Sequence, residues 1–361
     1  MAQVSAYEQF LSSASVVDVT TYDRDEFAAA SKDLLALCTE GLDDEHLLTR
    51  IRTRAHRLST ELVEMLTRFR ISSNEYGSLL LRGLPVGELP STPTDGSGPK
   101  WPELPMADTA LSLVMSVLGD PICYADEKKG ALIQDVAPVE HSEEHQENSG
   151  SVYLEFHTEN GFHPFRPDFI GLLCLRADHE RVASTATSAI VRALPLLPDA
   201  VINVLRRPLF RIRVSRSFTS GVGDPRFSSP APVLSGDLSR PELRVDFHAS
   251  EPLTSEAAEA LDALKDAMER VLVGAVLEPG DLFVVDNRTA AHARSGFQPQ
   301  YDGQDRWLRR MSVVTDLRAS GHVRQGVSRV CQPLPLYLRE DADPILFDPS
   351  PGPKRVAEQV S

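Results

Sequence analysis

Short apolar segments bounded by turn residues dominate the chain from about residue 121 onward, and this pattern constrains the fold more than any other feature of the sequence. Many short strands joined by long connections are typical of a closed or double-layered antiparallel core such as a jelly roll. The predicted strands cover 131–134, 151–157, 169–176, 209–216, 243–248, 282–286 and 307–315, and predicted helices near 197–206 and 254–275 interrupt them. We therefore expect a mainly β protein with flanking helices.

The first third of the chain has a helical pattern instead. Apolar residues recur at spacings of three and four over 43–70, which predicts one long amphipathic helix. The apolar segment Ser78-Leu-Leu-Leu-Arg lies between glycines and is the first predicted strand, and a further helix is predicted near 106–119. We expect one domain, made of a helical N-terminal part, a core with a helical insert, and a C-terminal extension rich in Pro and Asp: 1–120, 121–320 and 321–361.

Composition excludes several classes of protein. The 361 residues are 42% hydrophobic and 25% charged, as in a folded globular protein. The formal net charge of −15 disfavours a nucleic-acid partner, because such binding needs clustered Lys and Arg. The four cysteines form no CxxC spacing, and no stretch approaches the roughly 20 apolar residues of a membrane span. We expect a cytoplasmic protein that binds neither nucleic acid nor membrane; the sequence specifies no oligomeric state.

A candidate metal site lies in the segment Leu154-Glu-Phe-His-Thr-Glu. Side chains two apart on a strand share a face, so His157 and Glu159 can offer an imidazole nitrogen and a carboxylate oxygen to one ion. His292 follows a turn and the apolar strand 282–286, and a rolled sheet can bring it beside this pair. Two His and one carboxylate leave three metal positions open, which suits Fe(II) that binds an oxoacid and O₂. Taken alone, however, a His-x-Glu pair and a distant His also occur by chance.

Two arginines beyond His292 strengthen this interpretation. Arg306 and Arg310 lie four apart and share a face of the predicted strand, so that two guanidinium groups point the same way. Such groups bind carboxylates in bidentate fashion. Arg309 has the opposite parity and is predicted to lie on the surface. The alternative for the cluster is a solvated edge strand.

Together, these motifs resemble those of the clavaminate-synthase-like Fe(II)/2-oxoglutarate oxygenases, particularly the bacterial hydroxylases of free L-arginine, L-asparagine and L-lysine. The resemblance spans about 121–318. It is carried by Leu154-Glu-Phe-His-Thr-Glu, Phe162-His-Pro-Phe-Arg-Pro-Asp-Phe, Cys174-Leu-Arg-Ala-Asp, Asp286-Asn-Arg-Thr-Ala-Ala-His-Ala-Arg and Asp302-Gly-Gln-Asp-Arg-Trp-Leu-Arg-Arg.

The resemblance implies a double-stranded β-helix in which the two His and Glu159 hold iron, with 2-oxoglutarate and O₂ as cosubstrates. It implies that Arg306, assisted by the hydroxyl of Thr185, binds the C5 carboxylate of 2-oxoglutarate, and that Arg310 binds the α-carboxylate of the amino acid. The Ser/Thr run around Thr185 also fits plain turn chemistry. Related halogenases have Gly or Ala in place of the carboxylate ligand, so Glu159 favours hydroxylation.

Acidic residues suggest the type of amino acid. Asp126 and Glu127 precede the first metal ligand, and Asp246 lies in the predicted strand 243–248. Glu159 is itself expected to contact the substrate. Buried carboxylates favour a guanidinium or ammonium group and penalise a neutral side chain. We therefore expect a basic amino acid, of the arginine or lysine type, hydroxylated at C3 or C4. Alternatively, these acids are exposed surface residues.

Other outcomes remain open at this stage. The same iron site can perform desaturation or two successive hydroxylations, and a jelly roll can keep its ligands as a non-catalytic binding module. A zinc hydrolase has no use for Arg306 and Arg310. The polar loop 139–149 precedes the ligand strand and is a candidate lid. The resemblance also suggests a role in peptide natural-product (antibiotic) biosynthesis.

Overall fold

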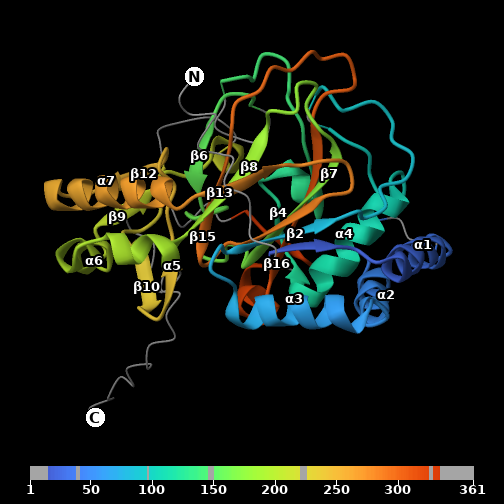
Figure 1. Ribbon diagram of the computed structural model, residues 1–361, viewed down its shortest axis with the longest axis horizontal. Helices are drawn as coiled ribbons and strands as arrows, with labels where there is room; N and C mark the ends of the chain where they lie inside the picture. Colours follow the sequence, from blue (N-terminus) through green and yellow to red (C-terminus); the bar gives the residue numbers. More distant parts are fainter. Residues whose placement is uncertain are drawn as a thin grey trace, which may run out of the picture.

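Two β-sheets face each other at the centre of the molecule (Figure 1). The computed structural model describes residues 15–37, 41–95, 97–144, 150–219, 226–324 and 328–333. The larger sheet has the strand order β1-β2-β14-β7-β16-β3, with β5 also paired to β16. Its strands are β1 (Val16–Asp18), β2 (Ser78–Arg82), β3 (Asp120–Pro121), β5 (Ile133–Val136), β7 (Phe169–Arg176), β14 (Leu282–Asp286) and β16 (Trp307–Val314).

The smaller sheet has the order β13-β8-β15-β6 and is antiparallel throughout. Its strands are β6 (Leu154–His157), β8 (Ser184–Ala189), β13 (Val273–Val276) and β15 (Ala290–Arg294). Three short pairs complete the β structure: β4 (Cys123–Tyr124) with β17 (Val330–Cys331), β9 (Phe210–Ile212) with β12 (Ser250–Pro252), and β10 (Leu234–Asp237) with β11 (Arg240–Leu243). This mainly β architecture with flanking helices agrees with the predicted fold class.

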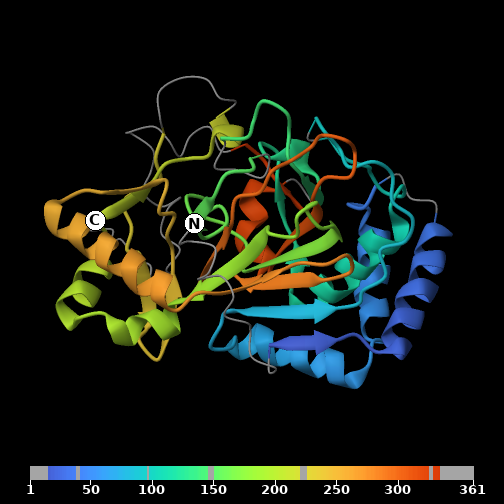
Figure 2. The ribbon, with the colours of Figure 1, turned by 45° about the horizontal axis from the view of Figure 1, so that its top comes forward.

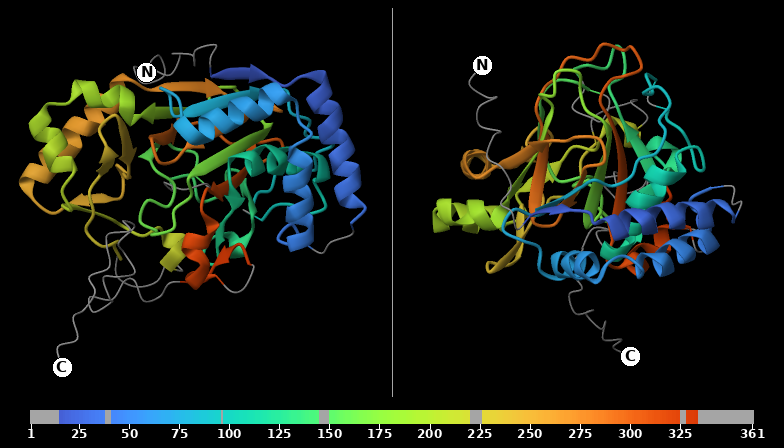
Figure 3. Two further views of the ribbon diagram at one scale, coloured as in Figure 1. Left: turned by 90° about the horizontal axis from the view of Figure 1, so that it is seen from below. Right: turned by 45° about the vertical axis from the view of Figure 1, so that its right-hand side comes forward.

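Helices cover the outer faces of both sheets (Figures 2 and 3). The larger sheet packs on α1 (Thr21–Leu35), α2 (Glu45–Ala55), α3 (Thr60–Ser72) and α4 (Pro105–Leu118), whereas α5 (Ile190–Ala193), α6 (Asp199–Leu205) and α7 (Ser255–Arg270) lie against the smaller one. A third apolar cluster fills part of the space between the sheets, with Leu172 and Phe283 from one sheet and Val273 and Ala290 from the other. This part of the space between the sheets is therefore buried from solvent.

Helix α4 packs directly on β7 because Gly171 has no side chain there. A Cβ at Gly171 would lie 2.5 Å from the sulfur of Met115 and 3.2 Å from Leu111. The helix is buried on nearly every side, between the sheet and its neighbouring helices, which accounts for a largely apolar sequence with Asp108 as its one charged residue. The four helices and the outer face of the sheet thus form one continuous core.

Some predicted elements need correction. The single helix predicted over 43–70 is two helices, α2 and α3, because Ser59 caps α3 by accepting a hydrogen bond from Leu62 N, and Asp23 accepts hydrogen bonds from both the main chain and the hydroxyl of Ser59. Of the strand predicted over 243–248, only Leu243 lies in a strand, as the last residue of β11. Asp246 forms only an isolated bridge. The Ser/Thr run around Thr185 is strand β8, not a turn.

Other predictions are confirmed. Strands β2, β7 and β14 have the predicted bounds. Within the described residues, no helix is both long and apolar enough to cross a membrane. The Pro- and Asp-rich tail from residue 334 onward and part of the loop 139–149 lie outside the described residues.

Candidate active site

The two predicted histidine ligands lie side by side on neighbouring strands of the smaller sheet. His157 of β6 and His292 of β15 are direct cross-strand partners, and their ring centroids are 4.2 Å apart. Cross-strand partners project from the same face of a sheet. That face looks toward the larger sheet, because Ala291 and Ala293 of β15, which have the opposite parity, pack against the helices on the outer side.

Glu159 completes the group. Its Oε2 lies 3.7 Å from Nε2 of His292, and one candidate ligand atom from each of the three residues lies within 4.8 Å of the others. A first-row divalent ion with bonds of about 2 Å separates ligands at right angles by about 3 Å, so small side-chain adjustments suffice to close this set around one ion. Two imidazoles and one carboxylate, all at least partly buried, thus fit the predicted iron site.

Hydrogen bonds and charges prepare both histidines for metal binding. Nδ1 of His157 lies 2.8 Å from the carbonyl oxygen of Glu155, and in the tautomer that donates this hydrogen bond the lone pair of Nε2 is free for a metal. Burial lowers the pKa of His292 well below its usual value, with further contributions from His157 and Arg310. His292 is therefore neutral, as a metal ligand must be.

Asn287 holds the main chain at Glu159, a role that sequence reasoning missed. The side-chain oxygen of Asn287 accepts a hydrogen bond from Glu159 N at 2.7 Å, and its amide nitrogen donates to the carbonyls of Glu159 at 3.0 Å and Pro167 at 2.8 Å. Asn287 is fully buried. The available signal was its place in the Asp286-Asn-Arg stretch, next to the turn that leads to β15.

Arg310 of β16 lies directly beside the carboxylate of Glu159. Its Nη1 is 2.7 Å from Oε1 of Glu159, and its Nη2 contacts Glu127 and Gln134. The two oxygens of Glu159 thus face different partners, Oε1 facing Arg310 and Oε2 facing His292. Burial opposes the charge on Arg310, but Glu127 and Glu159 outweigh it and raise the pKa of the guanidinium above its usual value.

Arg306 precedes β16 and reaches across to the smaller sheet. Its Nη2 donates to the hydroxyl of Thr185 on β8 at 3.0 Å, and both residues are buried. Burial lowers the pKa of Arg306, and within the described part of the chain it forms no ion pair with a carboxylate. The structure therefore brings together Arg306 and Thr185, the two residues predicted to bind the distal carboxylate of 2-oxoglutarate.

The predicted substrate acids have different surroundings. Glu127 is buried and pairs with Arg310, and its other oxygen accepts a hydrogen bond from Asn160 at 3.4 Å. Asp126 is only partly buried, and burial raises its pKa. Asp246 lies opposite His157 in an isolated antiparallel bridge, and its Oδ1 accepts hydrogen bonds from the main chain of His248 and Ala249.

Arg309 is not a surface residue, and that prediction was wrong. It is 2% exposed and donates to both oxygens of Asp108 on α4 and to both oxygens of Asp135 on β5. Burial raises the pKa of Asp108 to about 6, although Arg309 opposes this shift. Helix α4 covers the outer face of β16, so an arginine on this face is buried and needs acidic partners that are buried with it.

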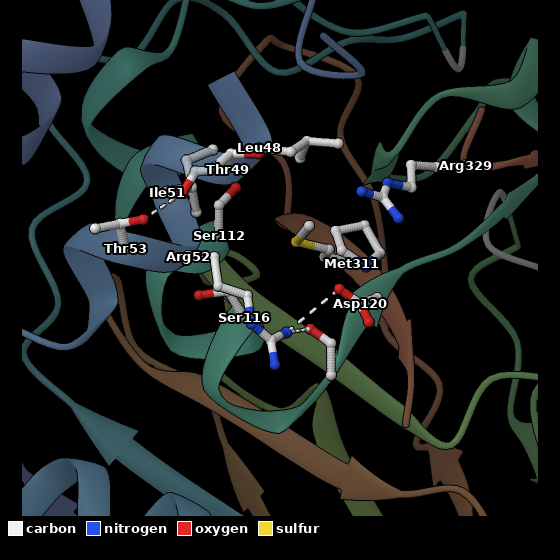
Figure 4. A pocket seen from close by; sticks show the side chains of 12 residues that line it. Leu48, Thr49, Ile51, Arg52, Thr53, Ser112, Ser116, Asp120, Met311 and Arg329 are labelled. Carbon is white, nitrogen blue, oxygen red and sulfur yellow. Dashed lines mark hydrogen bonds and ion pairs between the residues drawn. The ribbon is translucent and has the colours of Figure 1, made fainter. Parts of the chain in front are cut away.

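Two other features do not belong to this site. His179, Asp302 and Asp305 form a second group, in which His179 contacts the two carboxylates through different ring nitrogens, at 3.2 and 3.6 Å. A hollow of about 210 Å³ lies among α2, α4 and β16, where Arg52 pairs with Asp120 (Figure 4). None of the candidate metal ligands lines this hollow.

A sandwich of two sheets that encloses two histidines and one carboxylate is the arrangement expected of a mononuclear non-haem iron oxygenase. Comparison with known proteins defines the group further. The model of the TauD/TfdA family, described as taurine catabolism dioxygenase, matches residues 55–312. The chain belongs to this family of dioxygenases.

Three curated relatives match most of the chain. L-asparagine oxygenase of Streptomyces coelicolor is 44% identical over 78% of this chain and 84% of its own. Clavaminate synthase 2 of Streptomyces clavuligerus is 35% identical over 86% and 96%, and L-lysine 3-hydroxylase of Catenulispora acidiphila is 35% identical over 76% and 78%.

Solved structures agree with this assignment. A structure of asparagine oxygenase with Fe(II), 3-hydroxyasparagine and succinate is similar with a TM-score of 0.83 and 41% identity, covering 88% of this chain and 99% of that one. The non-haem iron oxygenase OrfP, solved with Fe and α-ketoglutaric acid, gives a TM-score of 0.77 and 28% identity over 88% and 99%. The structural similarity therefore extends over most of the chain and is not limited to the metal motif.

Proposed function

We propose that this protein is an Fe(II)- and 2-oxoglutarate-dependent hydroxylase of a free L-amino acid. The observation that carries the proposal is the position of His157, Glu159 and His292 on one inner surface, with the buried Arg306 just before strand β16 of the facing sheet. Among the residues that the structure describes, Arg306 forms no ion pair with a carboxylate. The triad suits Fe(II) with open positions, and the arginine suits a carboxylate at a distance from the metal. A metal site for hydrolysis alone does not account for this arginine.

The chain's own groups have separate tasks in this reaction. Bound iron would supply O₂ activation, coupled to decarboxylation of 2-oxoglutarate to succinate. Arg306 and Thr185 would hold the distal carboxylate of 2-oxoglutarate, which fixes its keto end toward the triad. The apolar cluster between the sheets would help to keep water away from the reacting groups.

Arg310 and Glu127 suit the common part of every amino acid. A guanidinium and a carboxylate lie next to each other here, and both are buried. An L-amino acid at neutral pH carries an α-carboxylate and an α-ammonium on one carbon, so this pair is complementary to it in charge. The position beside Glu159 would place the α- and β-carbons of the substrate near the metal, which favours attack at C3.

The substrate side chain is the finer part of the proposal. Asp246 lies opposite His157, so its carboxylate shares a sheet face with the metal ligand, and one oxygen is already engaged by the main chain. The other oxygen would accept a hydrogen bond from a side-chain amide or ammonium. We place asparagine first, because the asparagine oxygenase shares 44% identity with this chain. The basic amino acids suggested by the sequence come second, supported by Asp246 and the 35% identical lysine 3-hydroxylase.

The test is succinate release from 2-oxoglutarate, measured with Fe(II), ascorbate and a panel of L-amino acids that includes asparagine, aspartate, arginine, ornithine and lysine. The proposal requires coupled turnover with at least one of them and a product heavier by one oxygen atom. Loss of two hydrogens or gain of two oxygens would assign desaturation or dihydroxylation instead. Iron binding without coupled turnover on any amino acid would favour a binding module and contradict the proposal.

A variant of Asp246 tests whether this residue contacts the side chain of the substrate. Asp246→Asn is expected to raise the KM for the preferred substrate by roughly tenfold, the effect of losing one charge-assisted hydrogen bond. Succinate release without an amino acid should stay at the wild-type level. Unchanged KM in this variant would remove Asp246 from the substrate pocket.

A further inference from the structure

A second buried arginine lies beside the proposed cosubstrate site. Arg294 stands two residues after His292 on β15, so both side chains project from the inner face of the smaller sheet. It is the direct cross-strand partner of Thr185, whose hydroxyl accepts a hydrogen bond from Arg306. Arg294 is 5% exposed. The two arginines therefore approach one site from opposite sheets.

Within the described part of the chain, no carboxylate neutralises the positive charges at this place. Cζ of Arg294 lies 5.2 Å and Cζ of Arg306 lies 5.9 Å from the ring centroid of Phe297. Among the described residues, neither arginine forms an ion pair with a carboxylate. Asp178, an acid near Arg306, accepts hydrogen bonds from the main chain of Val182 and Ala183 through its two oxygens.

Arg294 also has unused hydrogen-bonding capacity. Its Nη2 donates to the carbonyl of Val152 at 2.7 Å, but its buried Nε has no hydrogen-bond partner among the described residues. Burying a cation without a counter-charge is costly, and burying two close together adds their repulsion. Two buried cations close together are best explained if an anionic ligand binds between them when the protein functions.

We propose that Arg294 is a selectivity residue for the cosubstrate, whose charge favours a 2-oxo acid with a second, distal carboxylate. This inference rests on the proposed function, since it assigns a role within the 2-oxoglutarate site. Arg306 and Thr185 contact the distal carboxylate directly, whereas Arg294 acts over a longer distance through its charge in a surrounding of low polarity. Together, the two guanidinium groups supply the positive charge that a dicarboxylate needs and a monocarboxylate does not.

A merely structural role makes a different prediction. Arg294 fastens Val152 to β15, and Phe297 N donates to the neighbouring carbonyl of Ser151 at 3.0 Å, so the arginine also helps to hold the segment that leads into β6. If this were its whole function, the charge of the side chain would be irrelevant. A substitute with a hydrogen-bond donor would then serve as well as a charged one.

The experiment compares Arg294→Lys with Arg294→Gln in the full-length chain loaded anaerobically with Fe(II). Both variants lose the planar guanidinium group and keep a hydrogen-bond donor, but only the lysine variant keeps the positive charge. Binding of 2-oxoglutarate and of 2-oxobutanoate, which lacks the distal carboxylate, is measured by calorimetry. Arg181→Met serves as the control, because Arg181 is 65% exposed and pairs with Glu278 at the surface.

We expect Arg294→Gln to weaken 2-oxoglutarate binding by roughly tenfold in Kd and to leave the Kd for 2-oxobutanoate unchanged, with Arg294→Lys within about threefold of wild type for both acids. Equal affinities of the Lys and Gln variants for 2-oxoglutarate, or equal weakening for both acids, would overturn the inference. Failure of the wild-type protein to bind 2-oxoglutarate at all would instead overturn the proposed function. If Arg294→Gln does not fold, loss of 2-oxoglutarate selectivity in a folded Arg294→Lys variant would also overturn it.

Discussion

The arginines on and beside strand β16 differ in what balances their charge. On the outward face, Arg309 binds Asp108 and Asp135, which come from a helix and a neighbouring strand. On the inward side, Arg306 has the hydroxyl of Thr185 and no carboxylate partner among the described residues. Arg310 lies between these extremes, because one of its acidic partners is Glu159 of the metal triad.

This difference separates stabilising charges from charges reserved for ligands. A buried arginine saturated by the protein's own acids contributes to the fold, and breaking the group is expensive. A buried arginine without an acid costs stability and is retained where a ligand supplies the missing charge. Three arginines within five positions of one sequence thus have three different tasks.

The largest effect on stability is expected on the outward face. Arg309→Met should lower the free energy of unfolding by about 3–5 kcal/mol, because it leaves Asp108 and Asp135 buried without their cation. Chemical denaturation of the variant measures this change, with Arg181→Met as the exposed control. A decrease of less than about 1 kcal/mol in the free energy of unfolding would mean that the ion pairs of Arg309 contribute little to stability. The contrast between the two faces of the strand would then disappear.

The inward face should respond in the opposite way. Arg306→Met is expected to weaken 2-oxoglutarate binding by roughly a hundredfold in Kd, since a charge-assisted, bidentate contact to its distal carboxylate is lost. The free energy of unfolding without ligand should stay the same or increase, because an uncompensated buried cation has been removed. Calorimetry and denaturation on the same sample measure both quantities. Marked destabilisation with unchanged 2-oxoglutarate binding would assign Arg306 to the fold instead.

A smaller effect is expected for the intermediate arginine. Arg310→Lys keeps the charge but loses the planar fork, so the KM for the amino-acid substrate should rise by roughly tenfold, while the KM for the cosubstrate 2-oxoglutarate changes by less than about twofold. Steady-state kinetics with each substrate varied in turn measure this split. Parallel increases in both KM values would show that Arg310 does not distinguish the two ligands.

The same strand shows what the sequence could predict. Alternation along β16 correctly separated Arg306 and Arg310 from Arg309, but it did not show what covers each face of the strand. The face that carries Arg309 was assumed to be exposed to solvent, whereas helix α4 covers it. A signal was present: Asp108 is the one charged residue of a largely apolar helix, and such an acid requires a buried partner. Its partner, 201 residues away, was beyond any local pattern.

The metal triad was predictable for a related reason. His157 and Glu159 are two apart in the sequence, and although β6 ends at His157 and Glu159 lies in the turn that follows, both reach the same site. His292 was found by family motif, and the register that pairs it with His157 is a tertiary property. Asn287 and Arg294 were missed because their function depends on contacts with the main chain at Glu159 and with a neighbouring strand, for which residue type and spacing give no specific pattern.

The central claim is that His157, Glu159 and His292 hold one ferrous ion. The most direct test is anaerobic Fe(II) binding by calorimetry to the wild-type chain, to His157→Ala and His292→Ala, and to His179→Ala, which alters the second histidine–aspartate group. The account predicts one tightly bound iron per chain in the wild type and in His179→Ala, and loss of this binding in the other two. Undiminished iron binding by His157→Ala and His292→Ala would contradict it.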